Sequence, residues 1–199
     1  MSDEYEMMCG IEIHQQLDTR KLFCDCESHL CEDGEGAYFR KLRPTTSEMG
    51  EVDRAALAQF QRHMGYRYQS CEGTSCLVEL DEEPPHSVNA DAMQVALTFS
   101  EMLGSNIIDE IHFMRKIVVD GSNTSGFQRT ALVATDGHID VGDRKISVLS
   151  VCLEEDAARK IETKGDEILY RLDRLGIPLI EIATGPDMRT PEEVQEVAY

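Results

Sequence analysis

Polar and apolar residues alternate in the first patterned segment of the chain, Met8–Leu17. Ile11 and Ile13 fall on one face of this segment, whereas Glu12 and His14 fall on the other. A period of two is typical of a half-buried strand. The polar face of this strand is therefore expected to carry a carboxylate and an imidazole two residues apart.

Helical spacing of apolar residues predicts two helices in the first half of the chain. The first covers residues 51–64, and the second begins at the capping residue Asn89 and ends near Leu103. The polar, glycine-containing stretch 28–50 favours irregular structure. The short apolar run Cys76–Leu80 is interpreted as a strand.

Strands dominate the second half of the chain. Asp136-Gly137, between two apolar runs, predicts a hairpin, and the glycine-rich stretch 121–126 predicts a loop. Further strands are expected at residues 107–120, 145–153, 168–173 and 178–183. Because strands come in groups with helices inserted between the groups, the pattern favours an α+β fold with a largely antiparallel sheet and flanking helices.

A helix start closes the sequence, where Thr190, Pro191 and Glu193 have the spacing of a capping box. The sequence ends inside this helix, at Tyr199. We therefore expect residues 1–199 to be the N-terminal part of a longer protein.

The 199 residues include 38 Asp and Glu against 19 Lys and Arg, which gives a net charge of −19. A hydrophobic content of 41% excludes a disordered chain. No apolar run is long enough to span a membrane, and the lack of a basic, apolar leader predicts a cytoplasmic protein. So large an excess of acid argues against tight binding of a nucleic-acid backbone by this segment. Dispersed acid with few lysines indicates adaptation to high salt or an ordinary acidic protein, and folding that strengthens in molar KCl would support the former.

The seven cysteines are an odd number, which in a cytoplasmic chain does not indicate a disulfide framework. Zinc binding is the alternative, with candidate ligands at Cys24, Cys26, Cys31, Cys71 and Cys76. The C-x-C pair among them is tighter than the spacing usual for structural zinc. We therefore expect reduced thiols without zinc.

Carboxylates inside predicted strands need a partner, because an isolated buried Glu is costly. The strand acids are Glu12, Glu154, Glu155 and Glu181. Acids on one polar face repel one another unless a cation lies between them, and oxygen ligands with one His suit Mg²⁺ or Mn²⁺ better than zinc. In the alternative interpretation each acid lies at a sheet edge or pairs with a nearby Arg, such as Arg159, Arg171 or Arg174.

No phosphate-binding loop, kinase signature or dinucleotide fingerprint occurs in the sequence. Arg115, Lys116 and Arg129 bracket the loop 118–126, and we interpret them as candidate contacts to the phosphates of a nucleotide. An ordinary surface loop is the alternative.

Four stretches together resemble a known family: GIEIHQQLDTRKLFCDC, VVDGSNTSGFQRT, CLEEDAARK and DRLGIPLIEIATGPDMRTPEE. They are similar to the N-terminal catalytic half of the B/E-subunit family of tRNA-dependent amidotransferases, in matching order over residues 7–199. The pair of Gln residues after His14 and the stretch LVELDEEPPH resemble the archaeal E branch more than the bacterial B branch.

The resemblance implies a glutamine synthetase-like cradle, incomplete in this chain, whose remaining part, helical domain and tail lie beyond Tyr199. It implies that the protein uses ATP and Mg²⁺ to phosphorylate the γ-carboxylate of Glu-tRNA(Gln). Ammonia from a partner amidase, the asparaginase-like D subunit, then gives Gln-tRNA(Gln). By this resemblance the metal ligands are Glu12, His14, Glu155 and Glu181, and the catalytic residues are Glu154, Glu155 and Glu181. Arg115, Lys116 and Arg129 remain the candidate ATP contacts.

Two other functions stay open at this point. A metal-stabilised interaction subunit without turnover would not bind ATP in a Mg²⁺-dependent manner. A free-standing ATP-dependent ammonia ligase would act on a small carboxylate, and competition by tRNA would exclude it.

Overall fold

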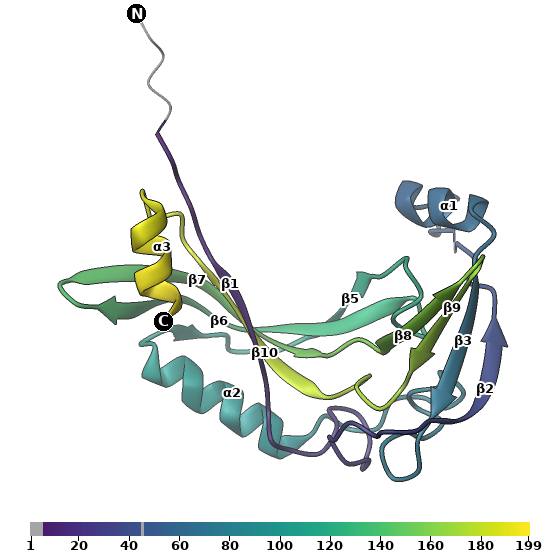
Figure 1. The fold of residues 1–199 in the computed structure, drawn as a ribbon. Helices are drawn as coiled ribbons and strands as arrows, with labels where there is room; N and C mark the ends of the chain where they lie inside the picture. Colours follow the sequence, from purple (N-terminus) through teal and green to yellow (C-terminus); the bar gives the residue numbers. More distant parts are fainter. Residues whose placement is uncertain (1–5, 45) are drawn as a thin grey trace, which may run out of the picture.

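Two β-sheets and three helices form a curved body in the computed structural model, which describes residues 6–44 and 46–199 (Figure 1). The ribbon rises as two arms on either side of a lower middle section, with α3 on one arm and α1 on the other. The arrangement confirms the α+β class with a largely antiparallel sheet and flanking helices. Within the described ranges, no helix has the length and apolar character needed to cross a membrane.

The larger sheet is antiparallel throughout and has the strand order β1-β10-β7-β6-β4, with β5 also paired to β6. Its strands are β1 (Glu12–Gln16), β4 (Asn106–Ile107), β5 (Phe113–Ile117), β6 (Phe127–Val141), β7 (Arg144–Glu155) and β10 (Pro178–Thr184). Most of these strands were expected from alternation, because one of their faces is buried.

The smaller sheet has the order β2-β3-β9-β8, with β3 and β9 parallel. Its strands are β2 (Glu35–Arg40), β3 (Gly65–Ser70), β8 (Arg159–Lys164) and β9 (Glu167–Arg171). The prediction that residues 28–50 are irregular is wrong for β2. This strand is exposed almost throughout and pairs through its backbone with β3, so no apolar alternation marks it.

Two of the three helices begin at the caps that the sequence predicts, whereas the helix expected at residues 51–64 is shorter and covers Arg54–Gln61. α1 (Arg54–Gln61) is capped by Asp53, and α2 (Ala90–Met102) by Asn89, whose side chain accepts from two backbone amides. α3 (Pro191–Ala198) carries the expected capping box. α2 packs on one face of the larger sheet through fully buried small residues such as Ala92 and Ala96.

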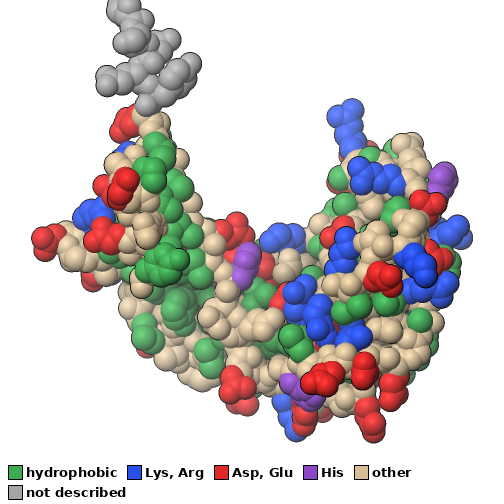
Figure 2. All heavy atoms as spheres, in the orientation of Figure 1, with side chains coloured by type: hydrophobic (Ala, Val, Ile, Leu, Met, Phe, Trp, Pro, Cys, Tyr) green, Lys and Arg blue, Asp and Glu red, His purple; other side chains and the backbone are tan. Residues whose placement is uncertain are grey.

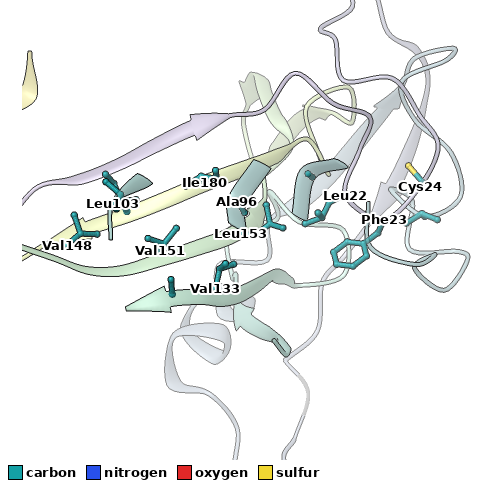
Figure 3. Close-up of a cluster of buried hydrophobic side chains, with 14 residues drawn as sticks. Leu22, Phe23, Cys24, Ala96, Leu103, Val133, Val148, Val151, Leu153 and Ile180 are labelled. Atoms are coloured by element: carbon teal, nitrogen blue, oxygen red, sulfur yellow. The ribbon is translucent and has the colours of Figure 1, made fainter. Parts of the chain in front are cut away.

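The main core lies between α2 and the larger sheet (Figure 3). Val133, Val151 and Leu153 are fully buried there, and Phe23 packs edge-on against Phe113. A second cluster belongs to the smaller sheet and is rich in tyrosine; its members include Tyr66, Tyr68, Tyr170 and Leu172. Each sheet therefore has its own buried layer.

The strand expected at residues 107–120 is divided into β4 and β5, and two further local predictions are wrong. β6 runs unbroken through Asp136-Gly137, and the turn to β7 lies instead at Gly142-Asp143. A Cβ on Gly137 would lie 2.2 Å from the Ser105 hydroxyl, so this glycine allows a close approach and not a hairpin. The run Cys76–Leu80 forms consecutive turns and not a strand.

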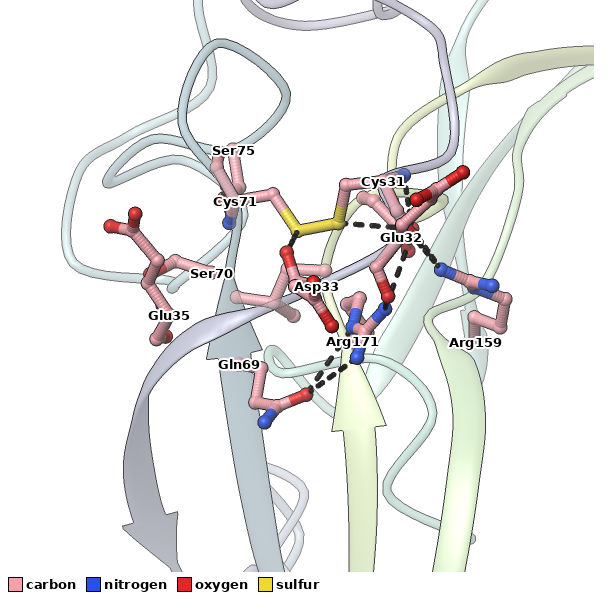
Figure 4. The surroundings of a disulfide bond; sticks show 12 residues. Cys31, Glu32, Asp33, Glu35, Gln69, Ser70, Cys71, Ser75, Arg159 and Arg171 are labelled. Atoms are coloured by element: carbon pink, nitrogen blue, oxygen red, sulfur yellow. Dashed lines mark hydrogen bonds and ion pairs between the residues drawn. A yellow bond between two sulfur atoms is a disulfide. The ribbon is translucent and has the colours of Figure 1, made fainter.

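Cys31 and Cys71 form a disulfide, which corrects the expectation that all cysteines are free thiols (Figure 4). The bond joins the segment before β2 to the end of β3. The Cys31 amide donates to Asp173, which also accepts from Arg159 at 2.5 Å. Sequence spacing gave no sign of this pair, because the two cysteines are 40 residues apart and meet through the antiparallel pairing of β2 with β3. The other five cysteines are free thiols among the described residues.

Candidate functional site

Strand register gathers several acids on one face of the larger sheet. His14 lies opposite Glu181, and Glu181 lies opposite Cys152 on β7. Paired residues of antiparallel strands point to the same side, as do residues two apart in one strand. Glu12 and Glu154 therefore share this face with His14 and Glu181.

The side chains on this face contact one another. His14 Nε2 lies 2.7 Å from Glu181 Oε2 and 3.5 Å from Glu12 Oε1. Lys116, from β5, places its Nζ 3.6 Å from Glu181 and 3.7 Å from Glu154. We call these five residues, Glu12, His14, Lys116, Glu154 and Glu181, the acidic cluster. One ligand atom each from Glu12, His14 and Glu181 lies within 4.8 Å of the others, which is the juxtaposition expected for a metal site.

Burial separates the roles of the carboxylates in the acidic cluster. Glu154 is 2% exposed and accepts hydrogen bonds from Thr130 and Gln128. Burial is the main cause that raises its pKa, with the neighbouring Glu181 charge adding to it. Burial also acts to raise the pKa of Glu181, but the hydrogen bond with His14 and the charge on Lys116 outweigh it and hold that pKa below its ordinary value.

Lys116 is the cation of the acidic cluster. Partial burial acts to lower the pKa of its ammonium, but the charges of Glu154, Glu181 and Glu12 outweigh this and raise the pKa above its ordinary value. Three carboxylates thus face one lysine. The surplus of negative charge suits a further cation at this position.

Glu155 lies on the opposite face of the larger sheet, so the expected set of metal ligands is corrected at this residue. Successive residues of a strand point to opposite sides, so Glu155 shares the core side with Leu153. It is 3% exposed and pairs with Arg129, whose Nη1 lies 3.2 Å from both carboxylate oxygens and whose amide donates to it. Burial raises the pKa of Glu155, and the Arg129 charge opposes this. The structure therefore does not bring Glu155 to the acidic cluster.

The three candidate nucleotide contacts are also separated. Only Lys116 reaches the acidic cluster. Arg115 points to the other side of β5, 5.1 Å above the Phe127 ring, and Arg129 stacks on Phe23 and Phe127 beside Glu155. The glycine-rich loop packs on the smaller sheet, where the Tyr68 hydroxyl donates to the Gly121 carbonyl.

The three arginines proposed as alternative partners do not neutralise the acidic cluster. Arg159 pairs with Asp173, and Arg174 lies 3.6 Å from Asp156. Arg171 donates to backbone carbonyls of residues 31 and 32. Pairing with these arginines therefore does not hold for Glu154 and Glu181, whereas Glu12 lies on the edge strand β1, as the alternative allows.

A second cluster of titratable side chains lies in the part of the chain before α2. Ligand atoms of Cys24, Cys26, Cys76 and Glu79 are within 4.8 Å of one another. The fully buried Lys21 places its Nζ 3.9 Å from Glu79. Burial raises the pKa of Cys24 and, to about 11, that of Cys76, while burial lowers that of Lys21. The C-x-C spacing indicated the thiols as candidate metal ligands, whereas Glu79 was missed as a ligand because it was assigned to a strand. The expectation that these thiols bind no zinc stays a prediction.

Figure 2 shows a trough between the two arms of the molecule, with a His side chain and Asp or Glu side chains near its floor. An antiparallel sheet that presents carboxylates, an imidazole and a lysine into a trough has the donor set for a divalent cation. The fold and the site thus define an α+β domain with a candidate cation-binding face.

Comparison with known proteins identifies the family. The family model described as the GatB/GatE catalytic domain matches residues 7–199, and the chain belongs to this family. It is 56% identical over 190 residues to the E subunit of Glutamyl-tRNA(Gln) amidotransferase from Aeropyrum pernix, covering 95% of this chain and 30% of that protein.

Relatives of the same name occur in other archaea. That of Methanocaldococcus jannaschii is 54% identical over 191 residues, covering 95% of this chain and 30% of the relative. That of Saccharolobus islandicus is 53% identical over 197 residues, covering 98% and 31%. The chain therefore spans about three-tenths of the length of these curated relatives.

Proposed function

We propose that this chain forms part of the kinase and amidation centre of a tRNA-dependent amidotransferase. In this proposal the protein uses ATP to phosphorylate the γ-carboxylate of Glu-tRNA(Gln), and ammonia displaces phosphate to give Gln-tRNA(Gln). The observation that carries the proposal is the convergence of Glu12, His14 and Glu181 on one face of the sheet. The names of the relatives support the substrate.

The donor set of the acidic cluster fits Mg²⁺. Glu12 and Glu181 supply carboxylate oxygens and His14 a ring nitrogen, while Glu154 and Lys116 lie next to them. Hard divalent cations prefer oxygen ligands, and Mg²⁺ commonly takes one or two carboxylates together with substrate phosphates. When bound there, Mg²⁺ would neutralise charge on the phosphate oxygens of ATP.

The chain's own residues orient and balance this centre. The hydrogen bond with His14 fixes the Glu181 carboxylate, and Thr130 and Gln128 fix that of Glu154. The Lys116 ammonium is held at the cluster by both carboxylates and offers positive charge to a transferred phosphoryl group. Phosphoryl transfer needs positioning and charge stabilisation more than a covalent nucleophile, and no residue of the cluster is a Ser or Cys.

The proposal assigns ammonia production to a partner protein, an asparaginase-like amidase. It also assigns most of the tRNA-binding surface to parts of the protein outside residues 1–199, because a segment with a net charge of −19 repels a phosphate backbone. The whole protein would act in the cytoplasm, where charged tRNA is made.

Substrate dependence of ATP hydrolysis tests the proposal. The full gene product is assayed for ADP formation with Mg²⁺ and either Glu-tRNA(Gln), uncharged tRNA or free glutamate. We expect ADP only with Glu-tRNA(Gln), and none when EDTA replaces Mg²⁺. Equal ADP formation with free glutamate would favour a small-carboxylate ligase. No Mg²⁺-dependent ATP binding at all would favour a non-catalytic interaction subunit.

A further inference from the structure

The face of the larger sheet that carries the acidic cluster continues toward the ends of β1 and β7. Gln16 on β1 has the parity of His14. Asp156, directly after β7, has the parity of Glu154. β10 lies between the two strands (Figure 1), and Gln16 Nε2 donates across it to Asp156 Oδ2 at 2.6 Å. Gln16 and Asp156 therefore meet on this face, and the proposed reaction has given neither of them a role.

The Asp156 carboxylate is held in place but keeps free acceptor positions. The Ala157 amide donates to its Oδ1 at 2.7 Å, and Gln16 holds its Oδ2. Arg174 Nε lies 3.6 Å from Oδ1 and donates instead to the Ala157 carbonyl. An ionised carboxylate accepts about four hydrogen bonds. Asp156, whose side chain is 19% exposed, is therefore open to further donors.

Gln16 adds a second acceptor beside this carboxylate. Its side chain is exposed, and its Oε1 accepts from no group in residues 6–44 and 46–199. Because its Nε2 is bound to Asp156, the Oε1 of the same amide is held next to the carboxylate. The two residues thus present acceptor oxygens side by side, which is the arrangement that a ligand with several N–H donors requires.

The charge of this face favours a cationic ligand. Arg174 balances the charge of Asp156, whereas in the acidic cluster three carboxylates face the single ammonium of Lys116. The potential at Asp156 therefore stays negative. Asp156 does not belong to the three residues of the acidic cluster whose ligand atoms converge, so it is open to a ligand other than a metal.

Spacing along the strand fits a ligand of a particular length. Residues of an antiparallel strand rise about 3.4 Å each, so Glu154 and Asp156 lie about 7 Å apart. In a glutamyl ester four covalent bonds separate the α-nitrogen from the γ-carboxyl carbon, an extended span of about 5 Å. One hydrogen bond of about 2.8 Å completes the distance. A glutamyl group with its γ-carboxylate at the acidic cluster therefore brings its α-ammonium to Gln16 and Asp156.

We propose that Asp156 and Gln16 bind the α-ammonium of the glutamyl group and so select an aminoacyl ester with a free amine. The Asp156 carboxylate and the Gln16 Oε1 accept from the ammonium, while the Gln16 amide nitrogen holds the carboxylate in place. An α-amino group has a pKa of about 7.7–8.0, so it is largely charged at neutral pH. The choice of a glutamyl group as the ligand rests on the proposed function.

N-acetylation of the substrate tests the ammonium contact directly. The full gene product is assayed for phosphorylation of Glu-tRNA(Gln) and of N-acetyl-Glu-tRNA(Gln), in which an uncharged amide replaces the ammonium. kcat and KM are measured separately. Asp156→Asn removes the carboxylate charge, and Asp156→Glu keeps it. Asp143→Asn, at the exposed turn between β6 and β7, is the matched control.

We expect the unaltered protein to prefer the free amine at least about tenfold in kcat/KM, because hydrogen bonds between charged groups are stronger than neutral ones. Asp156→Asn is expected to reduce this preference to below about threefold by raising the KM for Glu-tRNA(Gln), with kcat little changed. Gln16→Ala reduces the preference in part, since it removes one acceptor. Asp156→Glu and Asp143→Asn retain it.

A purely structural role for Asp156 predicts a different pattern. In that case Asp156→Asn slows both substrates equally and leaves their ratio unchanged, which would overturn the proposal. A preference that comes only from the bulk of the acetyl group persists in Asp156→Asn and contradicts the proposal as well. Equal use of both substrates by the unaltered protein does the same. Circular dichroism checks that each variant is folded.

The α-ammonium subsite and the proposed reaction fail separately. The affinities of the two charged tRNAs are measured in parallel by filter binding. Tighter binding of the free-amine form that Asp156→Asn abolishes keeps the subsite, even in a protein that transfers no phosphate. Phosphorylation of both tRNAs with equal rates and equal affinities keeps the reaction and removes the subsite.

Discussion

Glu181→Gln removes one charge from the acidic cluster and keeps the shape of the side chain. Glu181 Oε2 lies 2.7 Å from His14 Nε2 and 3.6 Å from Lys116 Nζ. If this carboxylate holds a cation against the phosphates of ATP, its loss acts on the transition state directly. By analogy with other preorganised charge stabilisers, we expect a cost of about 3 kcal/mol, or roughly 10²-fold in the rate of phosphoryl transfer.

The same substitution has a small effect on folding. At 3.6 Å and an effective dielectric of about 20, the attraction between Glu181 and Lys116 is at most ~5 kcal/mol. Lys116 is half exposed, which reduces that figure, and Glu154 contacts the same ammonium, so its repulsion of Glu181 offsets much of the rest. The free energy of unfolding is therefore expected to change by less than about 1 kcal/mol.

The assay follows transfer of labelled γ-phosphate to Glu-tRNA(Gln) by the full gene product with its partner amidase. Glu162→Gln, a surface change on β8, is the matched control and is expected to leave the rate unchanged. The partner's release of ammonia is expected to persist in both variants. Wild-type phosphorylation by a Glu181→Gln protein would refute the role given to this carboxylate.

Three further predictions concern the sheet that carries the site. Glu155→Gln leaves the Arg129 guanidinium buried without its charge partner, so urea unfolding should show a loss of about 2–4 kcal/mol with Mg²⁺ affinity unchanged; a tenfold loss of Mg²⁺ affinity would return Glu155 to the ligand set. Leu153→Ala, at a fully buried core position, should cost about 2–5 kcal/mol, and a cost below about 1 kcal/mol would contradict the packing described. Because burial raises the pKa of Glu154, the native state binds more protons there than the unfolded state does, and stability should fall as pH rises from the ordinary Glu pKa through the raised one. Glu154→Gln should remove this slope, and an unchanged pH profile would contradict it.

Alternation along single strands was enough to place three of the five residues of the acidic cluster on polar faces. Glu12 and His14 are two apart, and Glu181 lies between two isoleucines, so each was assigned to a polar face. The pairing of β1 with β10 and of β10 with β7 brings these faces together. The first of these pairings joins His14 and Glu181, which are 167 residues apart in sequence, and a local pattern does not contain such a contact.

Glu155 was misplaced although the sequence held the signal. Val151 and Leu153 are apolar and have the same parity as Glu155, whereas Glu154 has the opposite parity. Parity alone therefore places Glu155 on the core side, where Arg129 meets it. β2 gave no such signal, because it is exposed and owes its structure to backbone pairing with β3.

The hairpin predicted at Asp136-Gly137 is wrong because the prediction rested on turn preference alone. The pair is favourable for a tight hairpin turn, and Asp136 does adopt a positive φ of 58°. Pairing with β7 nevertheless continues through this point, and the close approach of Ser105 explains the glycine. Here tertiary packing outweighs local preference.

The position of a bound cation decides whether the acidic cluster is a metal site. Crystals of the full gene product grown with Mn²⁺ and an ATP analogue would reveal the metal by its anomalous scattering. We predict a peak at the acidic cluster, within about 2.3 Å of ligand atoms from Glu12, His14 and Glu181. A peak only at Cys24, Cys76 and Glu79, or a nucleotide bound with no metal at the acidic cluster, would contradict this assignment.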